Sequence, residues 1–334
     1  MSRFKKQLPF LILALLVYGW YFYTHLPASI PQHKNLAVLG ANTNIQLFIE
    51  PEAGDTPIVN AISSAQKEVL VEVYILSDKD VITALGDAEK RGVSVKVMLE
   101  EHPFGGGNLN PKTAQTLTDD GVAHEWTNPT FALTHEKAIV IDGSEAFILS
   151  QNLSASSFSK NREYDVLDNN PQDVSEVRTI FIDDWERQRF TPPSTHLVVS
   201  PVNSRDGIAT LLESAKTSID AEVEDIDDPE IISIMSEKAK TMPVRLVLPT
   251  VKQLSSNSEA ISTLRQAGVK VETLSSPYIH GKMIVVDGQK AYTGSENFST
   301  QSLDKNRELG IILAQPEALQ TLETTFASDW QKGE

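Results

Sequence analysis

The chain has 334 residues and a formal net charge of −16, with 45 acidic against 29 basic residues, a balance that disfavours long nucleic-acid partners because they bind basic surfaces. It contains no cysteine, which excludes disulfides, thiolate nucleophiles and cysteine-ligated metals. Hydrophobic residues make up 40% and charged residues 22%, which is typical of a globular chain, and the length suffices for two domains.

The N-terminus combines positive charge with an apolar run. Arg3, Lys5 and Lys6 precede the stretch LPFLILALLVYGWYFY. Extended to residues 8–26, the run is long enough to span a bilayer. We therefore predict a cytoplasmic basic tail over residues 1–7, then a transmembrane signal-anchor helix that leaves the rest of the chain extracytoplasmic at the cell membrane. The competing interpretation is a cleaved signal peptide and a secreted protein.

Alternating and β-branched segments predict strands, and segments closed by glycine predict helices. In chain order, the first half is expected to contain strand 69–75, helix 81–91, strand 93–99, loop 103–111, helix 112–120, strand 122–126, strands 137–141 and 146–149, and helix 171–188.

The second half repeats this order. Residues 208–228 align with 58–78 at an offset of 150, strand 244–248 corresponds to 93–99, and helix 258–267 is followed by Gly268. Strands alternating with helices predict an α/β fold with helices on both faces of a sheet. We therefore expect two tandem αβα sandwich domains, 36–190 and 196–332, that form an intramolecular pseudo-dimer.

The strongest signal is a repeat of polar residues. Residues 135–185 align without a gap on 280–330, at an offset of 145 because 280 − 135 = 145. Twenty of these 51 positions are identical. The identities include His135 and His280, and they fall mainly on groups that transfer protons or bind anions rather than on packing residues.

Each copy places a histidine two residues before a lysine. If both lie on one strand, the two side chains share a face because the strand period is two. Lysine binds phosphate oxygens, and histidine attacks phosphorus or moves a proton. Two histidines provide in-line displacement without a metal. The repeated serines and asparagines are expected to bind the phosphate oxygens, and the repeated glutamates to orient the imidazoles: Ser150, Asn152, Glu163, Ser295, Asn297 and Glu308.

The pattern His-x-Lys, four residues, Asp, six residues, Gly-Ser-x-Asn resembles the signature of the phospholipase D superfamily. The second copy matches in full with His280, Lys282, Asp287, Gly294, Ser295 and Asn297. The first copy has Leu149 where the family has glycine, and we expect this side chain to narrow the approach of the backbone to the phosphate.

The resemblance implies a metal-independent phosphodiesterase with no cofactor. It assigns the attack on phosphorus, through a phosphohistidine, to His135 and the role of general acid to His280. Lys137 and Lys282 belong to the same catalytic set, and Asp142 and Asp287 are structural. The resemblance points to phospholipids as substrates, cleaved by hydrolysis or by phosphatidyl transfer at a membrane surface. Because both motifs lie in one chain, a monomer suffices.

Two other functions remain open: a membrane-anchored nuclease of the same superfamily, and a catalytically silent binding protein with this fold. Two repeated pairs also need an interpretation. Trp185 and Trp330 are expected to pack in the core, whereas Arg162 and Arg307 support the adjacent glutamate or reach a phosphate. The acidic run 222–228 is interpreted as a solvated loop near the site rather than a calcium site, since it lacks EF-hand spacing.

Overall fold

The computed structural model describes residues 40–190 and 196–334. The predicted tail and transmembrane segment, residues 1–26, lie outside the described residues, as does the stretch between the two predicted domains, residues 191–195. Within the described ranges, no helix is long and apolar enough to cross a membrane.

The first half is built on a mixed sheet with strand order β1-β7-β6-β5-β2-β3-β4. β2, β3 and β4 run parallel, and the remaining neighbours are antiparallel. Its elements are β1 (Ile45–Glu50), α2 (Thr56–Ser64), β2 (Glu68–Val73), α3 (Lys79–Lys90), β3 (Ser94–Leu99), α4 (Leu109–Asp119), β4 (Ala123–Trp126), β5 (Lys137–Ile141), β6 (Glu145–Ile148), α5 (Ala155–Lys160), β7 (Asn161–Asp168) and α6 (Pro171–Trp185).

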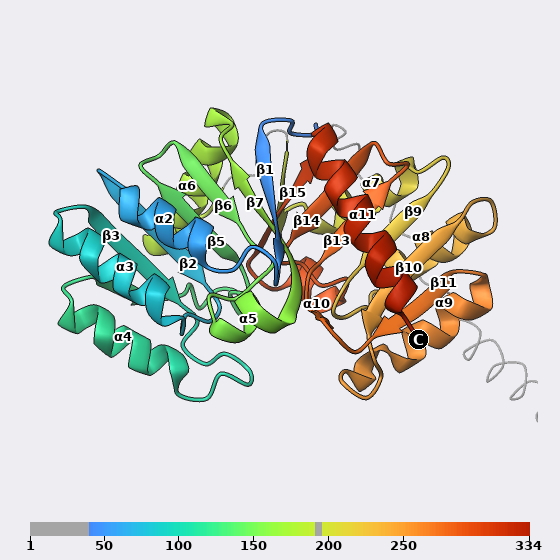
Figure 1. Ribbon diagram of the computed structural model, residues 1–334, viewed down its shortest axis with the longest axis horizontal. Coiled ribbons are helices and arrows are strands. Elements are labelled where there is room, and N and C mark those ends of the chain that lie inside the picture. Colours follow the sequence, from blue (N-terminus) through green and yellow to red (C-terminus); the bar gives the residue numbers. More distant parts are fainter. Residues whose placement is uncertain (1–39, 191–195) are drawn as a thin grey trace, which may run out of the picture. The chain divides into compact units, whose positions relative to one another are not determined.

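The second half repeats this design with strand order β11-β10-β9-β13-β14-β15-β8. Figure 1 shows the two sheets with their helices on either side of a central region that contains β7 and β15. The elements are β8 (Leu197–Ser200), α7 (Ser204–Ser214), β9 (Ile219–Glu222), α8 (Pro229–Ala239), β10 (Val244–Pro249), η2 (Ser255–Asn257), α9 (Ser258–Ala267), β11 (Lys270–Leu274), β12 (Tyr278–Ile279), β13 (Met283–Val286), β14 (Lys290–Gly294), α10 (Thr300–Asp304), β15 (Glu308–Leu313) and α11 (Pro316–Lys332).

Local signals explain where the helices begin and end. The carboxylates of Asp78 and Asp228, 150 residues apart, accept the backbone N–H groups that open α3 and α8, as N-cap residues do. Gly268 ends α9 with φ +100°, a conformation that glycine adopts without strain. The predicted strands and helices of the first half are confirmed, with ends displaced by up to a few residues. β1, β7 and β15 were not predicted.

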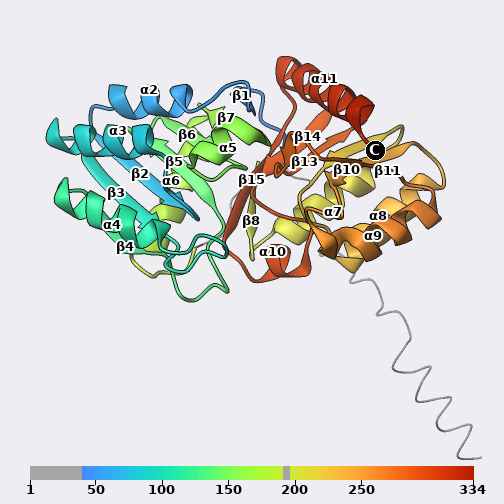
Figure 2. The same cartoon turned by 60° about the horizontal axis from the view of Figure 1, so that its bottom comes forward.

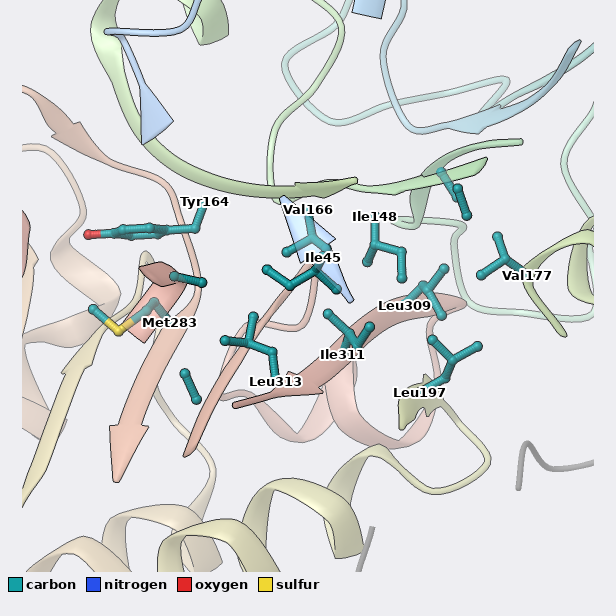
Figure 3. Close-up of a cluster of buried hydrophobic side chains, with 14 of the residues drawn as sticks. Ile45, Ile148, Tyr164, Val166, Val177, Leu197, Met283, Leu309, Ile311 and Leu313 are labelled. Carbon is teal, nitrogen blue, oxygen red and sulfur yellow. The ribbon is translucent and has the colours of Figure 1, made fainter. Parts of the chain in front are cut away.

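Three clusters of buried hydrophobic residues fill the molecule. Two lie within the separate halves, between each sheet and helices α2–α4 or α7–α9. The third is shared: Val166 on β7 and Ile311 on β15 lie in one cluster with residues of α6 and α11, and Figure 3 shows side chains of the two sheets facing each other. Trp185 and Trp330 pack against this cluster, which confirms the prediction for this pair.

The strand register brings both repeated motifs to one edge of the sheets. Val73, the last residue of β2, lies opposite Leu99 of β3 and also opposite Lys137 of β5. In the second half, Glu222 at the end of β9 lies opposite Met283 of β13. The carboxyl ends of the parallel strands therefore meet the segments that carry the two histidines. Figure 2 turns this side of the molecule toward the viewer.

Candidate active site

The segment that carries each histidine forms backbone hydrogen bonds with the opposite half. The backbone N–H of His135 donates to the carbonyl of Arg307 in the other half at 2.8 Å, and the N–H of Gly281 donates to the carbonyl of Arg162 at 2.7 Å. β12 pairs in parallel with β7. Both histidines therefore lie just before their strands and not within them, which corrects the expectation that His-x-Lys occupies a strand.

Each histidine contacts a glutamate of the opposite half. Nδ1 of His135 lies 2.9 Å from Glu308, and Nδ1 of His280 lies 2.7 Å from Glu163. The histidine side chains are 13% and 10% exposed, and both glutamate side chains are fully buried. Burial alone would raise the pKa of each glutamate, but the neighbouring imidazole and lysine charges lower it. Both carboxylates are thus anionic and fix the orientation of the rings.

Neighbouring polar side chains hold these glutamates in turn. The Ser150 hydroxyl donates to Glu163 at 2.8 Å, and the Asn161 amide donates to the same carboxylate at 3.0 Å. Glu308 accepts from the Ser302 hydroxyl at 2.5 Å and from the Asn306 amide at 3.0 Å. The repeated Lys-Asn-Arg-Glu sequence therefore contains both the glutamate and the asparagine that supports it.

The serines and asparagines expected to bind phosphate differ in their placement. Ser150 and Ser295 are fully buried, and each hydroxyl also accepts a backbone N–H from the following strand. The side-chain oxygens of Asn152 and Asn297 are buried and have no hydrogen-bond partner among the described residues. These oxygens accept hydrogen bonds, so a ligand would have to offer them a donor, whereas a phosphate oxygen could bond only to the amide N–H groups of the same side chains.

The amino group of each motif lysine bonds to the backbone carbonyl of the histidine two residues before it. Nζ of Lys137 donates to the carbonyl of His135, and Nζ of Lys282 donates to the carbonyl of His280 at 2.5 Å. Both lysines are fully buried. Burial lowers the pKa of Lys137 to about 7 and that of His135 to about 4. The first-half imidazole is therefore an uncharged base at neutral pH.

The motif aspartates occupy equivalent turns. Asp142 accepts the backbone N–H groups of residues 66–68, and Asp287 accepts those of residues 216–218. Both have positive φ, +54° and +56°. These contacts support a structural role, in which each aspartate ties a strand turn to the start of the neighbouring strand.

Arg162 and Arg307 neither support the adjacent glutamate nor reach a phosphate site. Arg162 pairs with Asp329 at 2.6 Å, and Arg307 pairs with Asp184 at 2.6 Å. Asp184 and Asp329 are themselves equivalent in the repeat, and both arginines are buried. Each bridge joins one half to the other. The repeated arginines therefore stabilise the interface between the halves.

The departure at position 149 has a packing explanation. Leu149 is fully buried in the first-half core and does not face a phosphate site, contrary to our expectation. At the equivalent Gly294, a Cβ atom would lie 2.3 Å from Cα of Gly310 and 2.8 Å from the hydroxyl of Tyr292. Where the first half packs a leucine side chain, the second half has a close approach of two backbone segments.

The acidic run 222–228 is not a solvated loop. Glu222 is fully buried and accepts the hydroxyl of Tyr164 at 2.6 Å, and Asp228 caps α8. Glu224 lies in the active site, 3.3 Å from Nζ of Lys282 and 3.6 Å from Nε2 of His280. Sequence reasoning missed Glu224. The alignment at an offset of 150 contained the signal, because it pairs this glutamate with Tyr74.

The comparisons with known proteins agree with this geometry. A family model described as "Cardiolipin synthase, PLD-like domain" matches residues 58–185 and again residues 208–330. The two matches cover most of the chain, so the chain belongs to this family of phospholipase D-like enzymes.

Similar proteins include cardiolipin synthases and solved structures of the same fold. Cardiolipin synthase A of Pseudomonas fluorescens is 24% identical over 87% of this chain and 69% of its own length, and cardiolipin synthase 1 of Bacillus anthracis is 21% identical over 86% and 67%. Phosphatidylserine synthase of Haemophilus influenzae, 12% identical, superposes with a TM-score of 0.66 over 90% of this chain and 89% of that chain. Polyphosphate kinase of Porphyromonas gingivalis, 14% identical, gives 0.67 over 85% and 50%. At these identities the structures establish the fold alone.

Proposed function

We propose that the protein is a phosphatidyltransferase that moves the phosphatidyl group of one phospholipid to the hydroxyl group of another, as cardiolipin synthesis requires. The observation that carries this proposal is the crossed pair of buried histidine–glutamate contacts, His135 with Glu308 and His280 with Glu163. Similarity to cardiolipin synthases supports the choice of a lipid alcohol as acceptor.

The proposed reaction has two steps. Nε2 of His135 attacks phosphorus, and His280 donates its proton to the oxygen of the departing alcohol. His280 then removes the proton of the acceptor hydroxyl, whose oxygen displaces His135 from phosphorus. The ammonium groups of Lys137 and Lys282 and the amides of Asn152 and Asn297 bind the phosphate oxygens.

Exposed apolar residues favour a lipid over a nucleic acid. Phe104, on the loop after β3, is 93% exposed, and Val251, on the equivalent loop after β10, is 43% exposed. Both loops follow strand ends at the active-site edge. The backbone N–H of Phe104 donates to the Tyr74 hydroxyl at 2.5 Å, and the Tyr74 ring contacts His135. These two exposed apolar side chains could enter the surface of a bilayer.

One assay separates the candidate functions. The full chain in mixed micelles receives phosphatidylglycerol with and without ethanol, and separately single-stranded DNA, each in the presence and in the absence of EDTA. Formation of cardiolipin, or of phosphatidylethanol when ethanol is present, supports the proposal. DNA cleavage without lipid turnover contradicts it in favour of a nuclease, and a folded protein inactive on both indicates a silent scaffold. Loss of activity on adding EDTA contradicts metal independence.

A further inference from the structure

The two halves of the active site differ at one pair of equivalent positions. Tyr74 and Glu224 both follow the strand that ends beside a histidine–lysine pair, 150 residues apart. The Tyr74 ring lies edge-on to His135, with centroids 4.9 Å apart, and Nζ of Lys137 lies 5.5 Å from its centre. The first histidine–lysine pair therefore has a neutral aromatic neighbour where the second has a carboxylate.

The surroundings of His280 are dominated by negative charge. Its Nδ1 lies 2.7 Å from Glu163 on β7, and its Nε2 lies 3.6 Å from Glu224 after β9. The other titratable groups facing it are Lys282, whose Nζ is 3.3 Å from Glu224, and Tyr278 on β12, whose hydroxyl donates to Glu224 at 2.9 Å. Both ring nitrogens of His280 thus face a carboxylate.

His135 contacts one carboxylate among the described residues, and the charge of Glu224 acts on it without contact. Glu308 contacts its Nδ1, while Lys137 and Lys282 add positive charge nearby. Burial alone would raise the pKa of Glu224, but the charges at His280 and Lys282 lower it to about 2. Glu224 is therefore ionised across the whole physiological range. A carboxylate beside an imidazole favours its protonated form. A buried imidazole with less negative charge around it stays neutral, because burial disfavours the charged form.

We propose that Glu224 is a positioning residue that keeps the proton on His280 and thereby makes His280 the acid and His135 the nucleophile. This inference rests on the proposed two-histidine reaction. In the first step, a bond forms between Nε2 of His135 and phosphorus as the bond to the leaving oxygen breaks. That oxygen takes the proton held on His280, which becomes neutral and ready to accept the proton of the incoming alcohol.

The first test needs no substrate. The full chain is prepared with isotope-labelled histidine, and the protonation of His280 is followed by NMR against pH in the parent protein and in Glu224→Gln. We expect His280 to lose its proton at lower pH in the variant. Coincident titration curves would overturn the proposal, whatever the enzyme turns over. If Glu224→Gln does not fold, Glu224→Ala is used for the same comparison.

A matched control comes from the next residue. Asp225 lies in the same loop and bonds to Ser256 at 2.8 Å, with no contact to His280 among the described residues. Asp225→Asn also removes one negative charge, and we expect it to leave the titration of His280 unchanged. An equal effect of both variants would mean that overall charge, and not the contact of Glu224, sets the protonation, which contradicts the proposal.

The second test uses turnover. In Glu224→Gln the high-pH side of the kcat/KM profile should move to lower pH, because the acid loses its proton sooner, while KM should not rise because Lys282 is freed for the phosphate. With phospholipid labelled at phosphorus and an alkaline quench, the label should be found on the peptide that contains His135. Label on His280, or an unshifted profile, contradicts the proposal. If the parent protein has no lipid turnover, the proposed function fails, and the NMR comparison still tests Glu224.

Discussion

Glu308 of the second half lies 2.9 Å from Nδ1 of His135 of the first half, and the reciprocal contact joins Glu163 to His280 at 2.7 Å. Neither half therefore contains a complete histidine–glutamate pair. The exchange follows from the backbone, because each histidine segment pairs with the strand that begins in the other half.

Replacing Glu308 with glutamine should remove most activity. The substitution keeps the size of the side chain but removes the charge that orients His135 and stabilises its cationic forms. We expect kcat to fall on the order of 100-fold or more, measured as phosphatidylethanol formation. Glu237→Gln is the control, since this glutamate forms an exposed pair with Lys240. Unchanged kcat in Glu308→Gln would contradict the role of the crossed pair.

The rate should fall in acid near pH 4. A nucleophilic imidazole must be unprotonated, and burial lowers the pKa of His135 to about 4, so the free base persists until the pH falls through that value. Below it, kcat/KM should decline about tenfold per pH unit. Circular dichroism at each pH verifies that the protein is folded. An acid-side midpoint near 6.5, the ordinary value for histidine, would show that His135 is not the attacking base.

Gly281 and Tyr164 should behave as a coupled pair. A Cβ atom at Gly281 would lie 2.6 Å from Cδ2 of Tyr164, so we expect Gly281→Ala to destabilise the fold by about 1–3 kcal/mol in urea denaturation. Tyr164→Leu, which supplies the residue present at the equivalent position 309, should offset part of this loss in the double variant. Strict additivity of the two effects would contradict the steric explanation.

Gly294→Ala is the contrasting case. A Cβ atom at position 294 would lie 2.3 Å from the Cα atom of Gly310. A second substitution cannot remove this contact, because it is made by the backbone. We expect a larger loss of stability than for Gly281→Ala, with no rescue from Tyr292→Phe. Equal stabilities of the two alanine variants would show that the β14–β15 contact can relax.

Asp287 should contribute to stability rather than to chemistry. Burial would raise its pKa, but backbone N–H groups of residues 216–218 and the Thr217 hydroxyl lower it to about 2. Asp287→Gly tolerates the positive φ but loses these bonds, so we expect a loss of about 1–3 kcal/mol with kcat retained. Because the pKa is lower in the folded state, the contribution is present above about pH 4 and is lost as pH falls through about 2. A pH-independent difference in urea denaturation would contradict this assignment.

Phe104 should matter only when the substrate is in a bilayer. Its side chain is 93% exposed, so Phe104→Ser costs little stability. We expect reduced turnover of vesicles and unchanged turnover of a short-chain phospholipid below its micellar concentration. Lys112→Ser, on the exposed part of α4, serves as the control. Equal turnover of vesicles by Phe104→Ser and the parent protein would remove the loop from the proposed membrane surface.

The repeat allowed the fold and most of the site to be predicted, because its matched residues are those that must occupy fixed positions relative to a partner. His135, Glu163 and Asp142 repeat since each must meet a particular partner. The single site shared by both copies was predicted, but the exchange of segments was not, because an offset of 145 does not say which glutamate each histidine meets. The pairing of His135 with Arg307 shows that its glutamate comes from the opposite half.

Unmatched positions were interpreted less well for a related reason. Leu149 and Glu224 were judged from local sequence, where a leucine beside a motif suggests steric hindrance and an acidic run suggests a solvated loop. The environment of Leu149 is set by the first-half hydrophobic core in which it is buried, and that of Glu224 by Lys282, which is distant in the sequence.

The contrast between Tyr74 and Glu224 depends on the covalent fusion of the halves. In an assembly of two identical subunits, any substitution would occur on both sides of the symmetry axis, and a carboxylate introduced beside one imidazole would also be introduced beside the other. A single chain with two copies is free of that constraint. Duplication within one gene thus permits one copy to specialise as a base and the other as an acid, a distinction that symmetric subunits acquire only transiently, when an asymmetric substrate binds.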